Sequence, residues 1–166
     1  MLFRSYNPLA KVPTLITNDI SIFDSPVIAE YIDQKSGLPY LIPSDFDKKI
    51  LVKRWEAISD GLCDAAVAIM LEKRKPLSQQ NNDLFEKQMK KIKLSLEWLN
   101  LEMEGKEYYL ENKFSYADIS AGCALGYVKL RYPEIDFKNE YLNLYHLYEL
   151  LMQRLSFQTT APEPYL

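Results

Sequence analysis

The feature that most constrains the fold is a helical repeat of apolar residues that runs without a break through positions 45–74 and ends before Pro76. A second repeat covers 84–103 and stops at Gly105, a residue suited to the left-handed end of a helix. The polar loop between the two repeats is short, so we expect two long helices packed antiparallel. Glycine is also scarce, at 5 residues in 166, which favours helices over a many-turned β-sandwich.

A further helix start is marked by Ser115 and Asp118, which stand at the two ends of a Ser-x-x-Asp motif. In such a capping box each side chain satisfies the backbone amide of the other residue. We expect this structural capping box to open a helix that continues to Arg131, followed by a last helix over roughly 141–155. The tail after that helix is expected to be irregular.

Two short β-rich runs lie near the start of the chain, over 12–17 and 20–23. They are separated by Asn18 and Asp19, a pair that tolerates the positive φ angles of a two-residue hairpin turn. The pattern therefore predicts an antiparallel β-hairpin in this part of the chain.

A short helix should follow the hairpin directly, with Ser25 as its N-cap and Gly37 as its stop. Residues 38–44 carry two prolines and no periodicity, so they are expected to form a linker. The sequence thus predicts two domains, 1–42 and 43–166. The first is a β-hairpin-plus-helix piece and the second is all-α, which makes the chain mainly α.

The charge of the chain limits its partners. With 20 basic and 23 acidic residues the net charge is −3, so no broad cationic field is present to attract nucleic acid or anionic lipid. No apolar run reaches the roughly 18 residues of a membrane-spanning helix, and the first residues lack the pattern of a signal peptide. We therefore expect a cytoplasmic protein with no nucleic-acid partner and no membrane partner.

Cysteine and histidine are too few for most metal sites. Cys63 and Cys123 fall far apart within helical patterns and are expected to be buried, reduced thiols. His146 is the only histidine, and neither a CxxC nor an HExxH motif occurs. Neither a metal site nor a histidine-based catalytic triad is therefore expected.

Four parts of the chain carry a resemblance to a known family. They are 7–13 (NPLAKVP), 23–32 (FDSPVIAEYI), the Arg-Trp-Glu-Ala, Asp-Gly and Asp-Ala-Ala elements within 54–66, and the capping box around Asp118. In this order they resemble the glutathione transferases of the bacterial, cytosolic type, and the resemblance covers essentially the whole chain. It implies a truncated thioredoxin-like, glutathione-binding piece over 1–42, followed by the all-α C-terminal domain of that family.

The resemblance also implies a glutathione-binding site. In the family the proline after the valine is cis, so we expect a cis Pro13 and a Val12 backbone that faces the ligand. Asp24 and Ser25 match the acidic-serine pair that holds the γ-glutamyl end of glutathione, at a helix N-terminus that favours carboxylates. Lys11 matches a position that can meet the glycyl carboxylate. The residues alone leave alternatives open: a trans Pro13, a Ser25 that only caps its helix, and a Lys11 without a partner.

The catalytic residue is unknown. Family members place a Tyr, Ser or Cys at the end of the first strand or the start of the first helix, where it stabilises the glutathione thiolate. Only six residues precede Asn7, whereas a strand-helix-strand unit needs roughly 30, so we expect that segment to be missing. Ser5 and Tyr6 occupy the approach to the third strand of the family fold and are not expected to be catalytic.

Two functions follow from the resemblance. The first is a glutathione transferase that conjugates glutathione to an electrophile and is impaired or inactive in this chain, because the catalytic segment is missing. The second is a non-catalytic interaction scaffold, similar to the stringent starvation proteins or the transferase-like domains of translation factors. The strand over 12–17 would have an unpaired edge, from which we expect a homodimer through that strand. The alternatives are the family's usual dimer, in which the hairpin domain packs on the partner's long helices, or a disordered N-terminal piece with only the helical domain folded.

Overall fold

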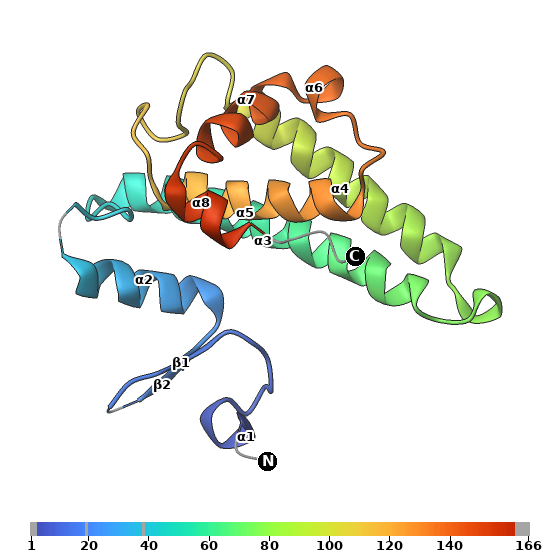
Figure 1. The fold of residues 1–166 in the computed structure, drawn as a ribbon, viewed down its shortest axis with the longest axis horizontal. Coiled ribbons are helices and arrows are strands. Elements are labelled where there is room, and N and C mark those ends of the chain that lie inside the picture. Colours follow the sequence, from blue (N-terminus) through green and yellow to red (C-terminus); the bar gives the residue numbers. More distant parts are fainter. Residues whose placement is uncertain (1–2, 19, 38, 162–166) are drawn as a thin grey trace. The chain divides into compact units, whose positions relative to one another are not determined.

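The computed structural model describes residues 3–18, 20–37 and 39–161, and it divides the chain into two compact units, Met1–Ser44 and Asp45–Leu166. Figure 1 shows a small unit with a two-stranded sheet and a larger unit made of helices. The predicted mainly α fold is confirmed. Each unit is described by itself.

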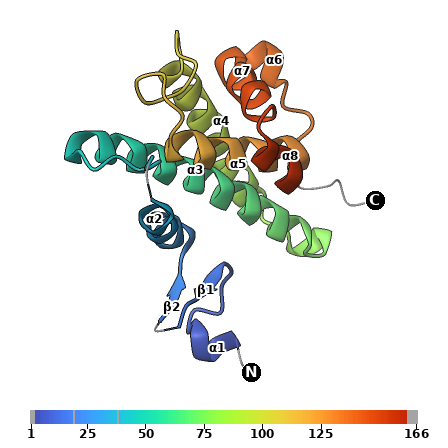
Figure 2. The ribbon, with the colours of Figure 1, turned by 60° about the vertical axis from the view of Figure 1, so that its left-hand side comes forward.

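The smaller unit is a β-hairpin placed between two helices. Its elements follow the chain in the order α1 (Phe3–Tyr6), β1 (Thr14–Ile16), β2 (Ser21–Phe23) and α2 (Ser25–Ser36). The two strands pair antiparallel with Thr14 opposite Phe23, Leu15 opposite Ile22 and Ile16 opposite Ser21. Figure 2 shows this hairpin beside α1 and before α2.

Both strands are shorter than the predicted runs. Pro13 has no N–H to give to a ladder and therefore cannot extend β1. At the other end, the amide of Thr17 donates to the carbonyl of Ile20 at 3.0 Å. The Thr17 hydroxyl accepts from the amide of Ile20 at 3.1 Å, so a side chain takes the place of a ladder bond there. Of the predicted turn, Asp19 lies outside the described residues.

Helix α2 ends where the sequence predicts and holds the chain that follows it. Gly37 adopts a φ of 82°, which ends the helix at its predicted stop. The buried carboxylate of Asp33 accepts hydrogen bonds from the amides of Leu41 at 2.7 Å and Ile42 at 3.1 Å. These two bonds fold the predicted linker back towards the last turns of α2.

The larger unit is built on two long helices, α3 (Phe46–Lys73) and α4 (Asn82–Glu102), joined by the short helix η1 (Leu77–Gln79). Each long helix begins at a side-chain cap. Asp45 accepts from the amide of Lys48 at 3.0 Å, and Asn81 accepts from the amide of Leu84 at 3.2 Å. Figure 1 shows the chain reversing between α3 and α4, which confirms the predicted antiparallel pair.

Helix α5 (Tyr116–Arg131) packs against α3 and begins at the capping box. The carboxylate of Asp118 accepts hydrogen bonds from the backbone amide of Ser115 at 2.8 Å and from its hydroxyl at 2.9 Å. It also accepts from the amide of Tyr109 at 2.9 Å, a bond that the sequence pattern does not reveal. Burial raises the pKa of the Asp118 carboxyl, although these three donors act to lower it.

The end of the chain is more helical than predicted. After α6 (Phe137–Glu140) and α7 (Leu142–Leu151), the chain forms a further helix, α8 (Leu155–Thr160), in the tail that was expected to be irregular. The backbone of Arg154 is extended, with φ −82° and ψ 133°, and this separates α7 from α8. A Cβ at Gly122 would lie only 2.6 Å from the Phe157 ring, so α8 packs directly against α5.

One apolar core holds the helices of the larger unit together. Trp55 lies at its centre and stacks on Tyr109, with ring centroids 3.9 Å apart at 23°. Burial of an apolar side chain of this kind contributes about 1.5–3 kcal/mol. The other large side chains with almost no exposed surface include Leu62, Ile69, Ile92, Leu96, Leu99, Leu125, Leu144 and Leu147. Among the described residues, no helix is long and apolar enough to cross a membrane.

The two cysteines are not both buried, which corrects the sequence prediction. Cys63 on α3 is half-buried, and burial raises the pKa of its thiol to about 12. Cys123 on α5 is exposed. Its neighbours Gly122 and Ala124 face the core, so the intervening side chain points away from that face of the helix.

Candidate functional site

The residues that the resemblance implies for glutathione binding meet at one end of the hairpin. Because Thr14 lies opposite Phe23, continuing the register places Pro13 opposite Asp24. The segment before β1 and the segment after β2 therefore lie side by side. Lys11, Val12 and Pro13 precede β1 and Asp24 and Ser25 follow β2, so the chain runs through all five at this end of the hairpin, within the smaller unit.

The peptide bond between Val12 and Pro13 is cis, as the resemblance implies. The Val12 side chain is 82% exposed. Among the residues that the structure describes, none forms a hydrogen bond with the Val12 amide or carbonyl. Both backbone groups are thus open to a peptide-like ligand that approaches this edge as an added strand.

Asn7 holds the segment that leads to Val12, a role that was not predicted for it. Its side chain is almost completely buried, at 1% exposed. The Nδ2 group donates to the carbonyl of Lys11 at 2.7 Å and to Oγ1 of Thr14 at 3.2 Å, while Oδ1 accepts from the amide of Leu9 at 2.9 Å. An Asn-Pro pair followed by a turn indicates such side-chain bonding to the local backbone, so this positioning residue could have been found.

Asp24, not Ser25, occupies the N-cap position of α2, which corrects the predicted cap. Its backbone has φ 77° and ψ 123°, a conformation that residues other than glycine rarely adopt. The Asp24 side chain makes no capping hydrogen bond, and the residue is exposed. Strain of this kind is often found at binding sites, where the surroundings hold the backbone in place.

Ser25 is the first residue of α2, so its hydroxyl is not needed as a cap. Among the described residues, no hydrogen-bond partner of this hydroxyl is found. The amide of Ile28 bonds to the carbonyl of Asp24 at 3.0 Å, whereas the amides of Ser25 and Val27 precede the first intrahelical bond. Free amides and the helix dipole together favour a carboxylate at this position.

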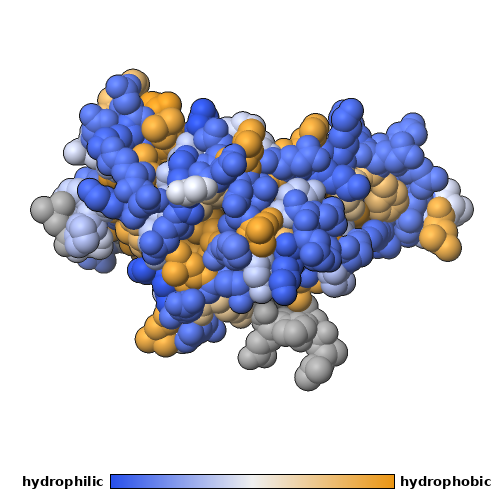
Figure 3. Space-filling model, turned by 90° about the horizontal axis from the view of Figure 1, so that it is seen from above, coloured by the Kyte–Doolittle hydropathy of each residue, from blue (hydrophilic) through white to orange (hydrophobic). Residues whose placement is uncertain are grey.

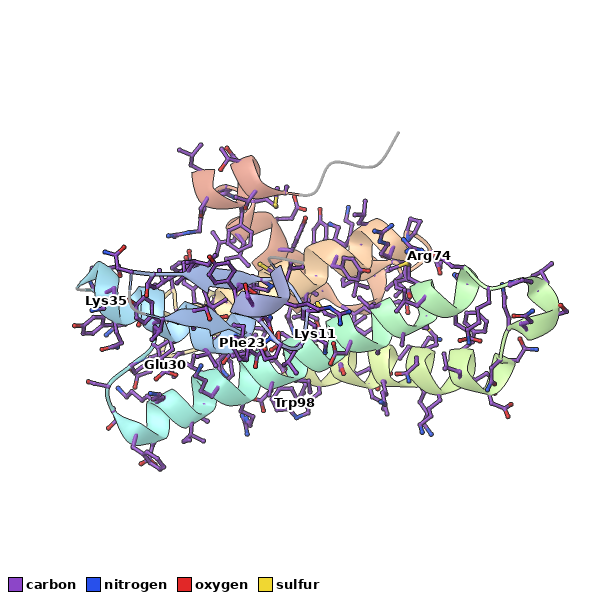
Figure 4. All side chains as sticks on the ribbon, turned by 90° about the horizontal axis from the view of Figure 1, so that it is seen from below. Lys11, Phe23, Glu30, Lys35, Arg74 and Trp98 are labelled. Atoms are coloured by element: carbon purple, nitrogen blue, oxygen red, sulfur yellow. The ribbon has the colours of Figure 1, made fainter. Side chains whose placement is uncertain are left out.

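Lys11 is exposed just before the cis bond, and Figure 4 marks it beside the hairpin. Within the described part of the chain, its ammonium has no ion-pair partner. The site therefore offers one exposed cation, one helix N-terminus, one carboxylate and an open peptide edge. This set of groups suits a small zwitterionic peptide with separated carboxylates.

Ser5 and Tyr6 lie in α1, which precedes the segment that carries Lys11 and Val12. The carbonyl of Tyr6 accepts a hydrogen bond from the Ser21 hydroxyl at 2.7 Å. Ser21 begins β2, whereas Asp24 follows its end. Over the described ranges, no group of three or more His, Cys, Asp or Glu side chains could hold a metal ion.

Both units match models of one protein family. Residues 82–149 match the model described as Glutathione S-transferase, C-terminal domain, and residues 1–34 match Glutathione S-transferase, N-terminal domain. The chain is 35% identical over 164 residues to the uncharacterized GST-like protein YibF of Escherichia coli K12. This alignment covers 95% of the chain and 78% of YibF.

Solved structures show the same relationship. A glutathione S-transferase from Methylobacillus flagellatus, crystallised with glutathione bound, superposes with a TM-score of 0.94 at 43% identity, over 97% of this chain and 80% of that one. A glutathione S-transferase from Methylobacterium radiotolerans, in complex with glutathione sulfonate, gives a TM-score of 0.93 at 28% identity, over 100% and 79%. The fold and these relatives support a glutathione-transferase-like function. With its 35% identity to YibF and its two matching domain models, the chain belongs to the glutathione S-transferase family.

Proposed function

We propose that this chain binds glutathione at the end of the hairpin and that its 166 residues alone conjugate glutathione to an electrophile poorly or not at all. The observation that supports binding is the open backbone of Val12 beside the uncapped N-terminus of α2. Glutathione bound to the M. flagellatus relative supports the same ligand. In this proposal residues 1–42 form the glutathione-binding domain and 43–166 the all-α domain.

Each part of glutathione has a counterpart in the site. The γ-glutamyl carboxylate would accept from the free amides of α2 and from the Ser25 hydroxyl, while the Asp24 carboxylate would lie near the ligand's ammonium. The cysteinyl backbone would pair with the amide and carbonyl of Val12, next to Pro13. The ammonium of Lys11 would meet the glycyl carboxylate.

Weak affinity is expected for the 166 residues alone. About a fifth of each solved relative lies outside the part that this sequence matches, since it covers 80% and 79% of them. Any support that this additional part gives to the bound peptide in the relatives has no counterpart in the residues of this chain. We therefore expect a dissociation constant in the millimolar range, on the order of −4 kcal/mol of binding free energy.

Calorimetric titration with glutathione tests the binding proposal. Ser25→Ala should weaken binding about tenfold, the loss of one hydrogen bond to a charged group. Ser36→Ala is the matched control, because Ser36 lies at the other end of the same helix and bonds only within the chain. Equal effects of the two changes, or no saturable binding at all, would contradict the proposed site. Sub-millimolar affinity would contradict the expected weakness.

Transferase activity is tested with an aryl halide. The 166-residue chain should give a rate indistinguishable from buffer, because none of its residues is assigned as a thiolate stabiliser and removing such a donor costs on the order of a hundredfold or more. A reproducible rate that Ser5→Ala or Tyr6→Phe abolishes would show that α1 carries the catalytic group. Retention on immobilised glutathione, competed by free glutathione, measures binding independently of turnover.

A non-catalytic interaction scaffold is the second candidate function. It is favoured by a row of apolar side chains on the outer face of α4, where Leu94 is 53% exposed and Leu101 is 66% exposed. Figure 3 shows that separate hydrophobic patches occur within a mostly hydrophilic surface. If the chain is a scaffold, immobilised glutathione should not retain it, and this outcome separates the two functions.

We also propose a homodimer through β1, in the cytoplasm, where the free thiols would stay reduced. Among the described residues β1 has only β2 as a neighbour, and Thr14 and Ile16 direct their backbone groups to the open edge. Pairing two such edges about a two-fold axis would satisfy these groups. A cysteine at Thr14 should cross-link between chains in a background without native cysteines. The α4 row is the alternative interface, and a monodisperse monomer at high micromolar concentration would exclude both.

A further inference from the structure

The larger unit contains a small pocket where the end of α4 meets the start of α7. It has a volume of about 360 Å³ and is lined by residues of α4, α6 and the first turn of α7. Figure 1 shows α7 beside the end of α4 and α6 beside α7. All of the lining residues belong to the larger unit, so this pocket is separate from the proposed glutathione site.

Asn100 of α4 fixes the walls of the pocket. Its Oδ1 atom accepts hydrogen bonds from the amides of Asn143 at 3.0 Å and Leu144 at 3.2 Å. Its carbonyl accepts a bond from Nδ2 of Asn143 at 2.9 Å. These bonds hold α4 against α7 and satisfy amides at the start of α7, where a helix otherwise favours an anion. The remaining charges therefore decide what the pocket binds.

Three glutamates supply the charge that lines the pocket. Glu97 and Glu104 come from the end of α4 and the turn after it, and Glu140 comes from α6. Within the described ranges no ion pair involves any of them. Glu140 accepts a long hydrogen bond, at 3.3 Å, from the amide of Asp136. The end of α4 adds the negative end of its dipole, so a cation could bind without displacing one already in place.

A buried hydroxyl also lines the pocket. Tyr141 is only 5% exposed, and its ring packs against Phe137 with centroids 5.8 Å apart. Among the described residues, no hydrogen bond of the Tyr141 hydroxyl is found. Burial and the carboxylates of Glu140 and Glu97 raise the pKa of this phenol. Buried hydroxyls generally have a partner, so Tyr141 indicates a hydrogen-bonding group that occupies the pocket.

The carboxylates on α4 are separated by an apolar side chain. Glu97, Leu101 and Glu104 are four and three residues apart, which places them on one face of the helix. The amide of Glu104 bonds to the carbonyl of Leu101 at 3.1 Å, so the turn continues the helical course. Leu101 is 66% exposed between the two acids. Seven residues of helix cover roughly 10 Å, so one small ion cannot contact both outer carboxylates.

We propose that this pocket binds a linear aliphatic diamine or polyamine. One terminal ammonium would donate to Glu97 and to the Tyr141 hydroxyl, and the other would donate to Glu104. The methylene chain between them would lie on Leu101. This order of groups in the ligand, charged then apolar then charged, matches the order of side chains along α4.

Calorimetric titration with 1,8-diaminooctane at low ionic strength tests the proposal. We expect saturable binding with a dissociation constant on the order of 0.1 mM. Octylamine has the same chain with one ammonium, and 1,3-diaminopropane has the same two charges on a shorter chain. Each should bind at least tenfold more weakly. Equal affinity for the long diamine and either control would overturn the proposal, because the pocket would then not recognise two separated ammonium groups.

Two charge-neutralised variants locate the site on α4. Glu97→Gln/Glu104→Gln should weaken binding of the long diamine about tenfold or more. Asp83→Asn/Glu86→Gln removes the same charge from the same helix at positions that do not line the pocket, and it should change binding less than twofold. Circular dichroism should show both variants folded. Equal effects of the two would overturn the proposal.

Tyr141→Phe tests the pocket wall without changing the charge. It should weaken binding of the long diamine about tenfold, the loss of one hydrogen bond to a charged group. Tyr145→Phe, at a half-buried tyrosine of α7 that does not line the pocket, should leave the affinity unchanged. Unchanged affinity in Tyr141→Phe would overturn the proposal. The absence of saturable binding to the parent chain, including the case in which a second copy covers the pocket, would also overturn it.

Discussion

The carboxylate of Asp118 accepts a hydrogen bond at 2.9 Å from the backbone amide of Tyr109, nine residues earlier in the chain. The same carboxylate holds the amide of Ser115 at the start of α5. Asp118 therefore fixes both a helix start and the loop before it, and all three residues are buried. Tyr109 also stacks on Trp55, so this loop is joined to the centre of the core.

Asp118→Ala should lower the free energy of unfolding by about 3 kcal/mol or more. A broken cap alone costs about 1 kcal/mol, but here two buried amides would lose their acceptor, each at about 1–3 kcal/mol. Urea unfolding measures the loss. Asp136→Ala is the control, because Asp136 caps the exposed start of α6 through Asn139 and should cost about 1 kcal/mol. Similar losses for both variants would mean that the Tyr109 bond adds nothing.

Gly122→Ala and Gly61→Ala should change stability in opposite directions. A Cβ at Gly122 would meet the Phe157 ring at 2.6 Å and Leu151 at 2.7 Å. Overpacking of this kind costs about 1–3 kcal/mol, more than the gain of about 1 kcal/mol from helix propensity. A Cβ at Gly61 has no atom within 4 Å, so that variant should be stabilised by about 0.5–1 kcal/mol. Thermal or urea unfolding checks both, and a stabilised Gly122→Ala would show that α8 moves away freely.

Deprotonation of Tyr132 should lower the free energy of unfolding at alkaline pH. Its hydroxyl donates to the carbonyl of Ala66 at 2.9 Å, and burial raises its pKa from 10.0 to about 12. The folded state thus holds the phenol proton more tightly than the unfolded state. The resulting stability is fully present below pH 10 and is lost as the pH rises through about 12.

Tyr132→Phe separates these effects. At pH 8 it should lower the free energy of unfolding by about 1 kcal/mol, the value of the lost hydrogen bond. Between pH 10 and 12 its stability should fall less steeply than that of the parent chain. Tyr40→Phe, at an exposed tyrosine, should leave the parent pH profile unchanged. Identical slopes for all three proteins would contradict the assignment to Tyr132.

Asn7→Ala should loosen the segment that carries Lys11 and Val12. The change removes the acceptor for the amide of Leu9 and the donor to the carbonyl of Lys11. Hydrogen exchange of the Leu9 amide should become at least tenfold faster, and any glutathione affinity should fall with it. Asn18→Ala, at an exposed turn position of the same hairpin, should affect neither quantity. Unchanged exchange at Leu9 would show that the turn holds itself without Asn7.

The helix boundaries could be read from the sequence where a single residue type decides them. Gly37 ends α2 because it reaches a positive φ without strain, and Pro76 follows the end of α3 because it cannot continue a helix. The Ser115 motif likewise marks the start of α5 through bonds within four residues. In each case the interaction is local, so its partners are visible in the sequence itself.

Features that depend on tertiary packing could not be read in this way. Helix α8 is short and has a weak helical pattern, and it forms where Phe157 fills the space left by Gly122. The exposure of Cys123 depends on which face of α5 meets the core, and the sequence pattern does not settle this for a helix that is apolar on most sides. The predicted cap at Ser25 was wrong by one residue, because Asp24 adopts a backbone conformation that its residue type rarely allows.

The position of Trp55 in the core decides what tryptophan fluorescence can report. The chain has two tryptophans, Trp55 and Trp98, with ring centroids 6.5 Å apart in the larger unit. Emission will therefore report the unfolding of that unit, whereas the hairpin and α2 carry only Phe23 and Tyr31 as aromatic residues. A tryptophan introduced at Tyr31 on α2 would give the smaller unit an optical reporter of its own.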